Sequence, residues 1–377
     1  MFKVNFNVGD ALYWGRSGLA FRRPVEELKD FLDSVYRRYG ITDQLLFGDR
    51  RPIHRPALAH AEVCGIRTHV FEEGYFRPYW VTLEREGVNG HSLLPRDPDW
   101  FWSVGERLEG DLPFESFHSP FLYRAAHDVA YHLSGTFNPV AFPHYRTHAP
   151  VNAAMEYAAY IGRFTRVKRR KAMDDATVNR LVAGALPYFV LPLQLNSDAQ
   201  IRDHSRFGDM LEVIDYVLAS FAGGAPGNSR LVIKNHPLDM GMVDYPVEIR
   251  NLAERYGLVT RVDYLETGDL GRLLERAVGI VTVNSTVGSF ALGMGCPTIA
   301  LSDPIYNLPG LTYQGNLNDF WRDMTPPNPE MFRRFRNVVM FATQVNGGFY
   351  CRTGIDLAVK NSAAALESDV SSLESLM

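Results

Sequence analysis

Two apolar runs that lie far apart in the chain end in ionisable side chains. The first run leads into Glu72 and Glu73, and the second leads into Lys234 and His236. In open α/β sheets, ligands bind at the carboxyl ends of the strands. Two carboxylates at one sheet edge, and a cation with an imidazole at another, therefore predict a cleft between two domains that binds an anionic donor.

Gln194 and Asp198 follow a third apolar run, at residues 188–191. A carboxylate placed after a strand can cap the next helix. It can also attack a sugar carbon as a nucleophile, with the glutamine amide orienting it. The segment is therefore a further candidate for chemistry, and these residues alone leave both interpretations open.

Asn284, Ser285 and Thr286 follow an expected strand and begin an expected helix. Either hydroxyl could cap that helix. The same geometry directs backbone N–H groups at an anion. We interpret these residues as a phosphate site, with a plain helix cap as the alternative.

His236 lies between Lys234 and Pro237, in the same expected sheet as the phosphate site. A histidine before proline at a strand end is often only part of a turn. Beside a phosphate site, however, an imidazolium could neutralise the charge that grows on a leaving phosphate. We therefore expect Lys234, His236 and Pro237 to contribute to donor binding.

The adjacent carboxylates Glu72 and Glu73 point to opposite sides of a strand, so only one of them readily faces a cleft. Their expected role is proton transfer with an acceptor hydroxyl. The alternative is a turn with solvated acids. Polar and aromatic side chains near the same strand ends are candidates for acceptor binding, although aromatic strands also build cores: Asp10, Asp49, Arg51, His54, Tyr75, Arg77, Glu84 and Asn89.

Size and composition favour a two-domain globular protein. The chain has 377 residues, and a single core rarely grows beyond about 250–300 residues. The net charge of −4 gives no reason to expect a nucleic-acid partner. Three well-separated cysteines indicate neither a disulfide framework nor a zinc pattern, and they fit a reducing cytoplasm. The N-terminus lacks a signal-peptide pattern, and the longest apolar run, residues 181–193, is shorter than the ~20 residues of a membrane span.

Strands and helices alternate in both halves, which predicts parallel sheets and an α/β fold. In the first half we expect strands at 2–6, 44–47 and 69–71, with helices at 25–39 and 56–64. In the second half we expect strands at 188–191, 231–233, 258–262, 279–283 and 298–301, with helices between them. Two Rossmann-like, doubly wound domains that face across a cleft describe the GT-B architecture of many glycosyltransferases. We place the domains at 1–165, with a linker to about 181, and at 182–330, and we expect 331–377 to cross back to the first domain.

A basic run between residues 163 and 171 ends an expected helix. Cations near a helix C-terminus are favoured by the helix dipole, so the run could be an ordinary solvated helix end. The alternative is a patch that is attracted to anionic lipid.

Taken together, the motifs resemble the capsule polysaccharide synthesis family, in particular the KpsC/KpsS group of bacterial Kdo transferases. The matching segments run in order through nearly the whole chain, and their joint order is more specific than any one of them: 5–10, 47–54, 72–78, 83–89, 194–198, 233–239, 283–288, 309–312, 320–321 and 347–350.

The resemblance implies a GT-B enzyme that uses CMP-β-Kdo and forms β-Kdo linkages with retention. The chain has one such module and no repeat, so it is similar to the KpsS type, which begins the poly-Kdo linker on a (lyso)phosphatidylglycerol acceptor. That implies a peripheral protein on the cytoplasmic face of the bacterial inner membrane, working with capsule biosynthesis and export proteins. The family's nucleophile in its Gln-x-x-x-Asp segment corresponds to Asp198.

The expected mechanism is a double displacement. Asp198 attacks the anomeric carbon of Kdo, His236 offsets the charge on the leaving CMP, and one glutamate of the pair, with Glu73 favoured, deprotonates the acceptor. Two inversions give net retention. We expect no cofactor and no metal, since the donor is activated by a single phosphate that protein cations can neutralise. The alternatives are a GT-B transferase or epimerase that uses another nucleotide sugar, and a non-catalytic component of capsule assembly or export.

Overall fold

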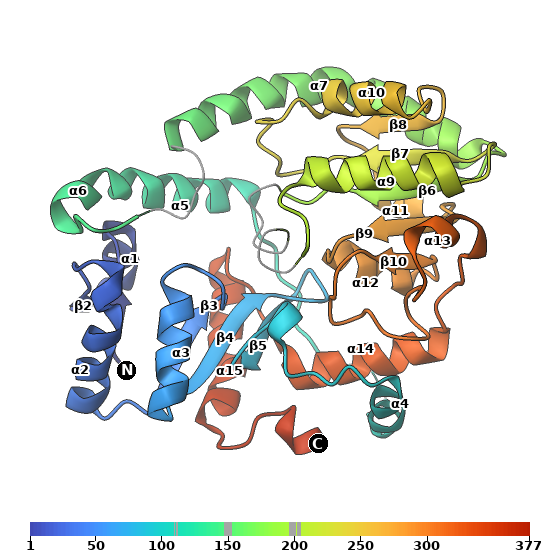
Figure 1. The fold of residues 1–377 in the computed structure, drawn as a ribbon. Helices are drawn as coiled ribbons and strands as arrows, with labels where there is room; N and C mark the ends of the chain where they lie inside the picture. The colour runs from blue at the N-terminus through green and yellow to red at the C-terminus, as the bar shows by residue number, and fades with distance from the viewer. Residues whose placement is uncertain (109, 111, 147–152, 196–200, 202–204) are drawn as a thin grey trace. The chain divides into compact units, whose positions relative to one another are not determined.

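The computed structural model describes the chain except for residues 109, 111, 147–152, 196–200 and 202–204. The described residues form two compact units (Figure 1). Unit 1 comprises residues 1–94, 111–150 and 339–377, and unit 2 comprises residues 95–110 and 151–338. The expected α/β class is confirmed, because helices flank a sheet in each unit.

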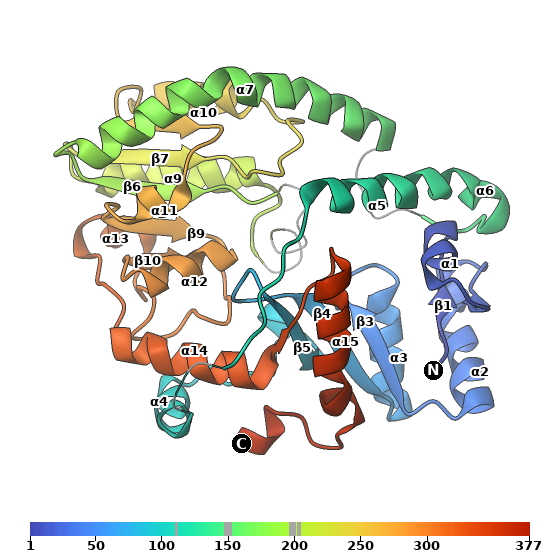
Figure 2. The ribbon, with the colours of Figure 1, turned by 180° about the vertical axis from the view of Figure 1, so that it is seen from behind.

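Unit 1 is built on a four-stranded sheet in the order β11-β5-β4-β3. Helices α3 and α15 lie on opposite faces of this sheet (Figures 1 and 2). The elements of the unit are β1 (Val4–Asn5), α1 (Val8–Trp14), β2 (Leu19–Ala20), α2 (Leu28–Tyr39), β3 (Asp43–Phe47), α3 (His54–Cys64), β4 (Arg67–Glu73), β5 (Trp80–Arg85), α5 (Phe121–Ser134), α6 (Asn138–Ala141), β11 (Gln344–Asn346) and α15 (Arg352–Glu367), with short 3-10 turns between them.

The sheet of unit 1 is mixed, whereas the alternation of strands and helices predicted a parallel one. Only β3 and β4 are parallel, and β5 runs antiparallel to both β4 and β11. The reason is the short connection between β4 and β5, since a parallel crossover needs a dozen or more residues. The expected first strand is also different, because β1 pairs only with β2 in a separate two-stranded sheet.

Unit 2 contains a five-stranded, wholly parallel sheet in the order β10-β9-β6-β7-β8. The chain starts at the central strand β6, moves outward through β7 and β8, and then returns to the other side of β6 at β9. The elements of the unit are α4 (Pro98–Arg107), α7 (Ala153–Ala183), β6 (Tyr188–Pro192), α9 (Met210–Gly224), β7 (Arg230–Lys234), α10 (Tyr245–Arg255), β8 (Val262–Leu265), α11 (Leu270–Leu274), β9 (Gly279–Thr282), α12 (Thr286–Gly293), β10 (Thr298–Ala300), α13 (Leu317–Asp323) and most of α14 (Pro329–Thr343).

Both faces of the unit 2 sheet are buried, which explains why its strands read as continuous apolar runs. On one face, Leu231 and Ile233 belong to a core that includes α9, α10 and α13. On the other face, Val232 packs in a core with Val178 of α7 and Leu273 of α11. The side chains of one strand thus alternate between two cores, as the pleat requires.

The expected linker at 166–181 is instead part of the long helix α7, which packs against the unit 2 sheet. Its buried Val178 and Leu181 explain why the segment folds with unit 2 rather than bridging two domains. The expected boundary at 165 therefore falls inside a helix. Residues 95–110 also belong to unit 2, and residues 339–377 belong to unit 1. No helix in the described part of the chain is long and apolar enough to span a bilayer.

Candidate functional site

Three sequence segments meet at the carboxyl ends of β3 and β4 in unit 1. The ring of Phe349 packs edge-on against Phe47 at 4.9 Å and against Phe71 at 6.2 Å between centroids. The backbone N–H of Gly48 donates to the carbonyl of Phe71 at 2.8 Å. The segment around residue 350, from near the end of the chain, is thereby fixed beside the acidic pair.

Glu73 is held by two groups at this edge. It accepts a hydrogen bond from the hydroxyl of Tyr350, and Arg77 Nη2 lies 3.8 Å from its Oε2. The Arg124 guanidinium lies 3.8 Å from the Tyr350 ring centroid, and burial, followed by the charge of Glu73, raises the pKa of Tyr350. Since the Glu73 side chain is still 28% exposed, it is oriented yet within reach of a ligand.

Glu72 makes different contacts from Glu73. Its Oε1 accepts from the backbone N–H of Glu73 at 3.0 Å. Its Oε2 would lie 3.1 Å from a Cβ atom at Gly48, so any side chain at position 48 would crowd this carboxylate. Gly48 also has φ +73°, a conformation that favours glycine. The two carboxylates therefore have separate environments.

The turn after β3 provides a buried acid and a neutral imidazole. Burial raises the pKa of Asp49, although His91 and Arg50 oppose the rise. His54 Nδ1 donates to the Gly48 carbonyl at 2.7 Å, and burial lowers the pKa of His54 to about 4. His54 is therefore neutral at pH 7, and Arg51, which is exposed and lies over the Phe47 ring, is the cation that the turn presents to solvent.

Tyr75 and Glu84, two of the expected acceptor contacts, are buried and hydrogen-bonded to each other. The Tyr75 hydroxyl donates to Glu84 Oε1 at 2.6 Å and accepts from the backbone N–H of Asn89 at 2.6 Å. Burial, followed by the charge of Glu84, raises the pKa of Tyr75. Asp10 is similarly engaged, since it accepts from Phe6 N and from the Tyr131 hydroxyl. These groups support the backbone around the edge.

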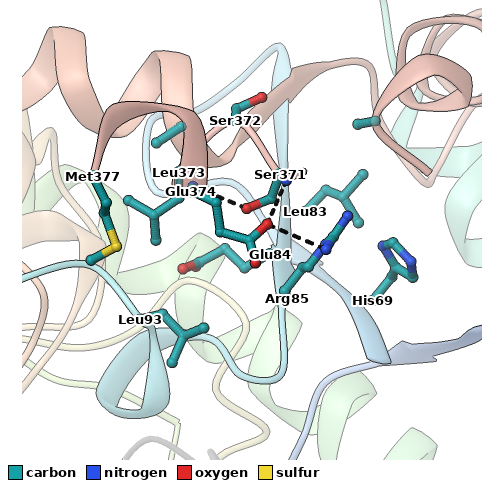
Figure 3. A pocket seen from close by; sticks show the side chains of 12 residues that line it. His69, Leu83, Glu84, Arg85, Leu93, Ser371, Ser372, Leu373, Glu374 and Met377 are labelled. Atoms are coloured by element: carbon teal, nitrogen blue, oxygen red, sulfur yellow. Dashed lines mark hydrogen bonds and ion pairs between the residues drawn. The ribbon is translucent and has the colours of Figure 1, made fainter. Parts of the chain in front are cut away.

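A small cavity in unit 1 lies beside His69 of β4 and Leu83, Glu84 and Arg85 of β5, and the acidic pair does not line it. Figure 3 shows it between β5 and the C-terminal segment, where Glu374 pairs with Arg85 at 3.2 Å. Its volume is about 60 Å³, which is room for a few waters and too little for a sugar. It is lined by His69, Leu83, Glu84, Arg85, Leu93, Ala342, Ala365, Ser371, Ser372, Leu373, Glu374 and Met377.

In unit 2, two loops are joined where the strand order reverses. Gln194 Nε2 donates to Asn284 Oδ1 at 3.0 Å, and the backbone N–H of Asn284 donates to Gln194 Oε1 at 3.3 Å. Gln194 follows β6 and Asn284 follows β9, the neighbouring strands on either side of the reversal. Ligands of open α/β sheets bind at such a switch point, so Gln194 and Asn284 mark the strongest candidate site of this unit.

Ser285 caps helix α12 beside this switch point. Its Oγ accepts from the backbone N–H of Val287 at 3.2 Å, and its carbonyl accepts from the Tyr306 hydroxyl at 2.7 Å. The cap interpretation is therefore correct for the Ser285 oxygen. The hydroxyl proton and the half-exposed Thr286 are the groups that would meet an anion at this helix start.

The loop after β7 holds His236 in a defined orientation. The backbone N–H of Leu238 donates to His236 Nδ1 at 3.1 Å, and Asn235 Oδ1 accepts from His236 N at 2.8 Å. Because Nδ1 is an acceptor, the neutral ring carries its proton on Nε2. Pro237, next in the loop, is exposed.

Arg163 fixes this loop, and sequence reasoning missed it by assigning it to the basic run. The residue is buried on α7. Its Nη1 donates to the carbonyls of Pro237 at 2.7 Å and Asp239 at 2.5 Å, and its Nη2 donates to the carbonyl of His236 at 3.0 Å. Its Nε pairs with Glu266 Oε1 at 2.8 Å. One guanidinium therefore donates hydrogen bonds to three backbone carbonyls of the turn that contains His236 and Pro237.

Glu266 accepts hydrogen bonds from Arg163 and from two neighbouring side chains. Its oxygens accept from Tyr264 at 2.7 Å and from Asn235 Nδ2 at 3.2 Å. Burial disfavours the charged form, but the hydrogen bonds from Tyr264 and Arg163 outweigh it, so the pKa of Glu266 is lowered. A charged, buried carboxylate is therefore part of the support for the loop.

Lys234 is less accessible than expected for a phosphate ligand. It is buried, and its Nζ donates to the carbonyl of Asn235 at 3.3 Å. Burial, followed by the nearby charge of Arg163, lowers the pKa of Lys234. Direct contact with a phosphate is therefore not supported by this conformation, and Lys234 contributes positive charge from beneath the loop.

The remaining expectations for this unit concern Asp198 and the basic run. Asp198 lies outside the described residues. In the basic run, Arg163 is buried, Lys171 pairs with Asp175 at 3.0 Å, and the Arg170 guanidinium is 6.0 Å from the Tyr264 ring centroid. The side chains that the run exposes to solvent are Arg166, Lys168, Arg169 and Lys171, so the surface patch is smaller than the sequence suggested.

Comparison with known proteins gives consistent matches over most of the chain. Residues 42–350 match a family described as "Capsule polysaccharide biosynthesis protein". The chain is 36% identical over 352 residues to the capsule polysaccharide export protein KpsS of Escherichia coli, covering 92% of this chain and 89% of that protein. It is 33% identical over 356 residues to the capsule polysaccharide modification protein LipB of Neisseria meningitidis serogroup B, covering 92% and 85%.

Among solved structures, one similar chain is the β-Kdo 2,7 transferase of KpsC from Thermosulfurimonas dismutans. The TM-score is 0.44 at 15% identity, and the match covers 89% of each chain. The β-Kdo 2,4 transferase of the same protein gives a TM-score of 0.38 at 13% identity, covering 87% and 86%. Both TM-scores are below 0.5, so the family of this chain is inferred from the sequence relatives and not from these structures.

Proposed function

The chain belongs to the capsule polysaccharide biosynthesis family, and on this premise we propose that it is a retaining β-Kdo glycosyltransferase that uses CMP-Kdo. The main support for the proposal is the arrangement of the loops after β6, β7 and β9. Gln194, after β6, is hydrogen-bonded to Asn284, after β9. Arg163 of α7 holds the turn that contains His236, after β7. These loops end neighbouring parallel strands, where such sheets bind ligands.

Unit 2 binds the donor in this proposal. The start of α12, with Ser285 and Thr286, receives the phosphate of CMP. His236 donates from Nε2 to the oxygen that leaves with the phosphate, and Lys234 adds positive charge from within the unit. Hydrogen-bond donors aimed at developing negative charge lower the barrier without the help of a protonated imidazole. Gln194 and Asn284 hold the two loops together around the sugar.

The reaction in this proposal is a double displacement, in which two successive substitutions take place at the anomeric carbon. A carboxylate oxygen of Asp198 bonds to the anomeric carbon while the bond to the CMP phosphate breaks, and the phosphate keeps the electron pair. An acceptor hydroxyl then attacks the same carbon, the bond to Asp198 breaks, and the hydroxyl proton passes to Glu73. Two inversions retain the anomeric configuration. In this proposal the units face each other in a GT-B arrangement.

The acceptor in this proposal is a (lyso)phosphatidylglycerol, which receives the first Kdo of a poly-Kdo linker. The exposed cations Arg51 and Arg77 at the edge of unit 1 suit an anionic headgroup. Such an acceptor would place the protein peripherally on the cytoplasmic face of the inner membrane, beside other proteins of capsule biosynthesis and export.

A direct assay tests the proposal. Incubation with CMP-Kdo and a fluorescent lysophosphatidylglycerol should give one product heavier by a single Kdo residue, measured by mass spectrometry. CMP should also raise the melting temperature, because a ligand that binds only the folded state stabilises it, whereas UDP should not. Transfer from a UDP-sugar would favour another nucleotide-sugar enzyme. No reaction with any donor, together with normal capture of partner proteins, would favour an assembly component.

The choice between the two glutamates is also testable. We expect Glu73→Gln to lower transfer to the acceptor about 100-fold, since a positioned general base typically contributes at least this much. The first displacement should survive, so the glycosyl-enzyme should accumulate in intact-protein mass spectra. Glu72→Gln is the matched control, and it should retain transfer. A larger loss in the Glu72 variant than in the Glu73 variant would reverse the assignment.

A further inference from the structure

A cluster of aspartate, histidine and cysteine lies in unit 1, away from the edge that carries Glu72 and Glu73. Asp33 is on α2, and His60 and Cys64 are on α3, four residues apart and thus on one helix face. Helix α3 ends at Cys64, just before the amino end of β4, whereas the acidic pair is at the carboxyl end of that strand. None of the three side chains takes part in the proposed reaction.

The three side chains bring one possible ligand atom each into a single cluster. His60 Nε2 lies 3.5 Å from Cys64 Sγ and 3.8 Å from Asp33 Oδ1, and all three atoms are within 4.8 Å of one another. With bond lengths of about 2.3 Å to sulfur and about 2.0–2.1 Å to nitrogen, a tetrahedral zinc site separates these two atoms by about 3.5 Å. The corresponding nitrogen-to-oxygen separation is about 3.3 Å, so the Asp33 oxygen must move about half an ångström closer to His60. The Cys64 side chain must also turn, because its sulfur lies 3.9 Å from His60 Nδ1 as well.

Neighbouring residues orient two of these ligands. The Tyr36 ring stacks on the His60 ring, with centroids 5.8 Å apart and planes at 12°. Arg37 Nη2 pairs with Asp33 Oδ2 at 2.9 Å, which leaves Oδ1 as the oxygen that faces His60. Outer partners of this kind fix the orientation of metal ligands. Two of the three side chains therefore have contacts that hold them near the cluster.

The three candidate ligands differ in solvent exposure: one is buried, and the other two are reachable from solvent. The His60 side chain is only 6% exposed, the Asp33 side chain is 31% exposed, and Cys64 is exposed. A metal ion could enter from the solvent side, and water could fill the fourth position. An entry path and a fixed inner ligand are both needed for a usable metal site.

We propose that Asp33, His60 and Cys64 bind one zinc ion. A nitrogen, sulfur and oxygen donor set of borderline softness is typical of zinc. On binding, Cys64 loses its thiol proton to solvent and coordinates as the thiolate, and His60 coordinates through neutral Nε2. The ion connects α2 to α3 and stabilises unit 1, and its fourth position stays open to water. The alternative is a thiol that only makes a weak hydrogen bond to His60.

Cobalt(II) titration of the full-length, chelator-stripped protein under reducing conditions tests this site. The wild-type protein should show a thiolate-to-cobalt charge-transfer absorption that saturates at one equivalent and disappears when zinc(II) is added. Cys64→Ser should lose the absorption. Asp33→Asn should weaken cobalt binding by at least the roughly 10- to 100-fold that loss of an outer partner costs, because an amide oxygen is a poorer ligand than a carboxylate.

Cys351→Ser is the matched control, because serine oxygen can replace the sulfur that accepts from Gly354 N. This variant should keep the absorption. Circular dichroism of each variant should match that of the wild type, since Cys64 and Asp33 are not buried. Absence of the absorption in the folded wild-type protein, or an unchanged absorption in Cys64→Ser, would overturn the proposed site. Neither result depends on the glycosyltransferase activity.

Discussion

Asp198→Asn is expected to abolish the glycosyl-enzyme intermediate and to lower turnover about 10³-fold or more, as removal of a nucleophile from a catalytic group does. The amide has no negative charge with which to form the bond to the anomeric carbon. The variant should still bind CMP, because the phosphate contacts proposed for Ser285, Thr286 and His236 do not involve this carboxylate. The measurement is intact-protein mass spectrometry after mixing with CMP-Kdo, together with the rate of CMP release.

Asp209→Asn is the control for this substitution. Asp209 caps helix α9 by accepting from the backbone N–H of Glu212 at 2.9 Å, and asparagine caps helices about as well as aspartate. The control should therefore keep both stability and turnover while making the same change in charge. If the Asp198 variant still carried a Kdo adduct and turned over normally, the nucleophile would have to be a different residue.

Arg163→Ala is expected to lower the free energy of unfolding by about 3–5 kcal/mol, the usual cost of removing one partner from a buried ion pair. The substitution leaves the Glu266 carboxylate buried without its cation. It also releases the carbonyls of His236, Pro237 and Asp239 that the guanidinium holds. Urea denaturation measures the first effect, and the rate of Kdo transfer measures the second.

Arg163→Lys separates charge from position. Lysine restores a cation for Glu266, but a single ammonium cannot reproduce the planar fork of donors that reaches three carbonyls. We expect much of the stability to return, while turnover stays about 10-fold below wild type because His236 is no longer fixed. Arg166→Ala, an exposed cation on the same helix, should change neither quantity. Full turnover in Arg163→Lys would mean that the arginine has a purely structural role.

Local sequence patterns predicted most strands of unit 2, although the strand expected at 258–262 is β8 at Val262–Leu265. The apolar runs at 188–191, 231–233 and 279–283 correspond to β6, β7 and β9, because strands covered on both faces are continuously apolar. The pattern was less informative in unit 1. There a six-residue connection made β5 antiparallel to β4, and strand direction depends on that connection rather than on the composition of the strand.

For the candidate site, the sequence placed ionisable residues at strand ends, and the structure adds contacts that the sequence did not predict. Tyr75 and Glu84 were expected to bind the acceptor, yet they are buried against each other. Lys234 was expected to touch phosphate, yet it is buried with its Nζ on a backbone carbonyl. A residue type says what a side chain can do, but neighbours from other elements decide whether solvent or a ligand can reach it.

The sequence by itself determined the α/β class, the order of the motifs and the family, since each depends on residues that are close together in the chain. Only the tertiary structure decided which residues support the site. Tyr350 meets Glu73 across 277 positions, and Arg163 meets Glu266 across 103. Such contacts arise when whole helices and strands pack to bury apolar surface, so the pairing of two distant polar residues depends on that packing rather than on the pattern around either of them.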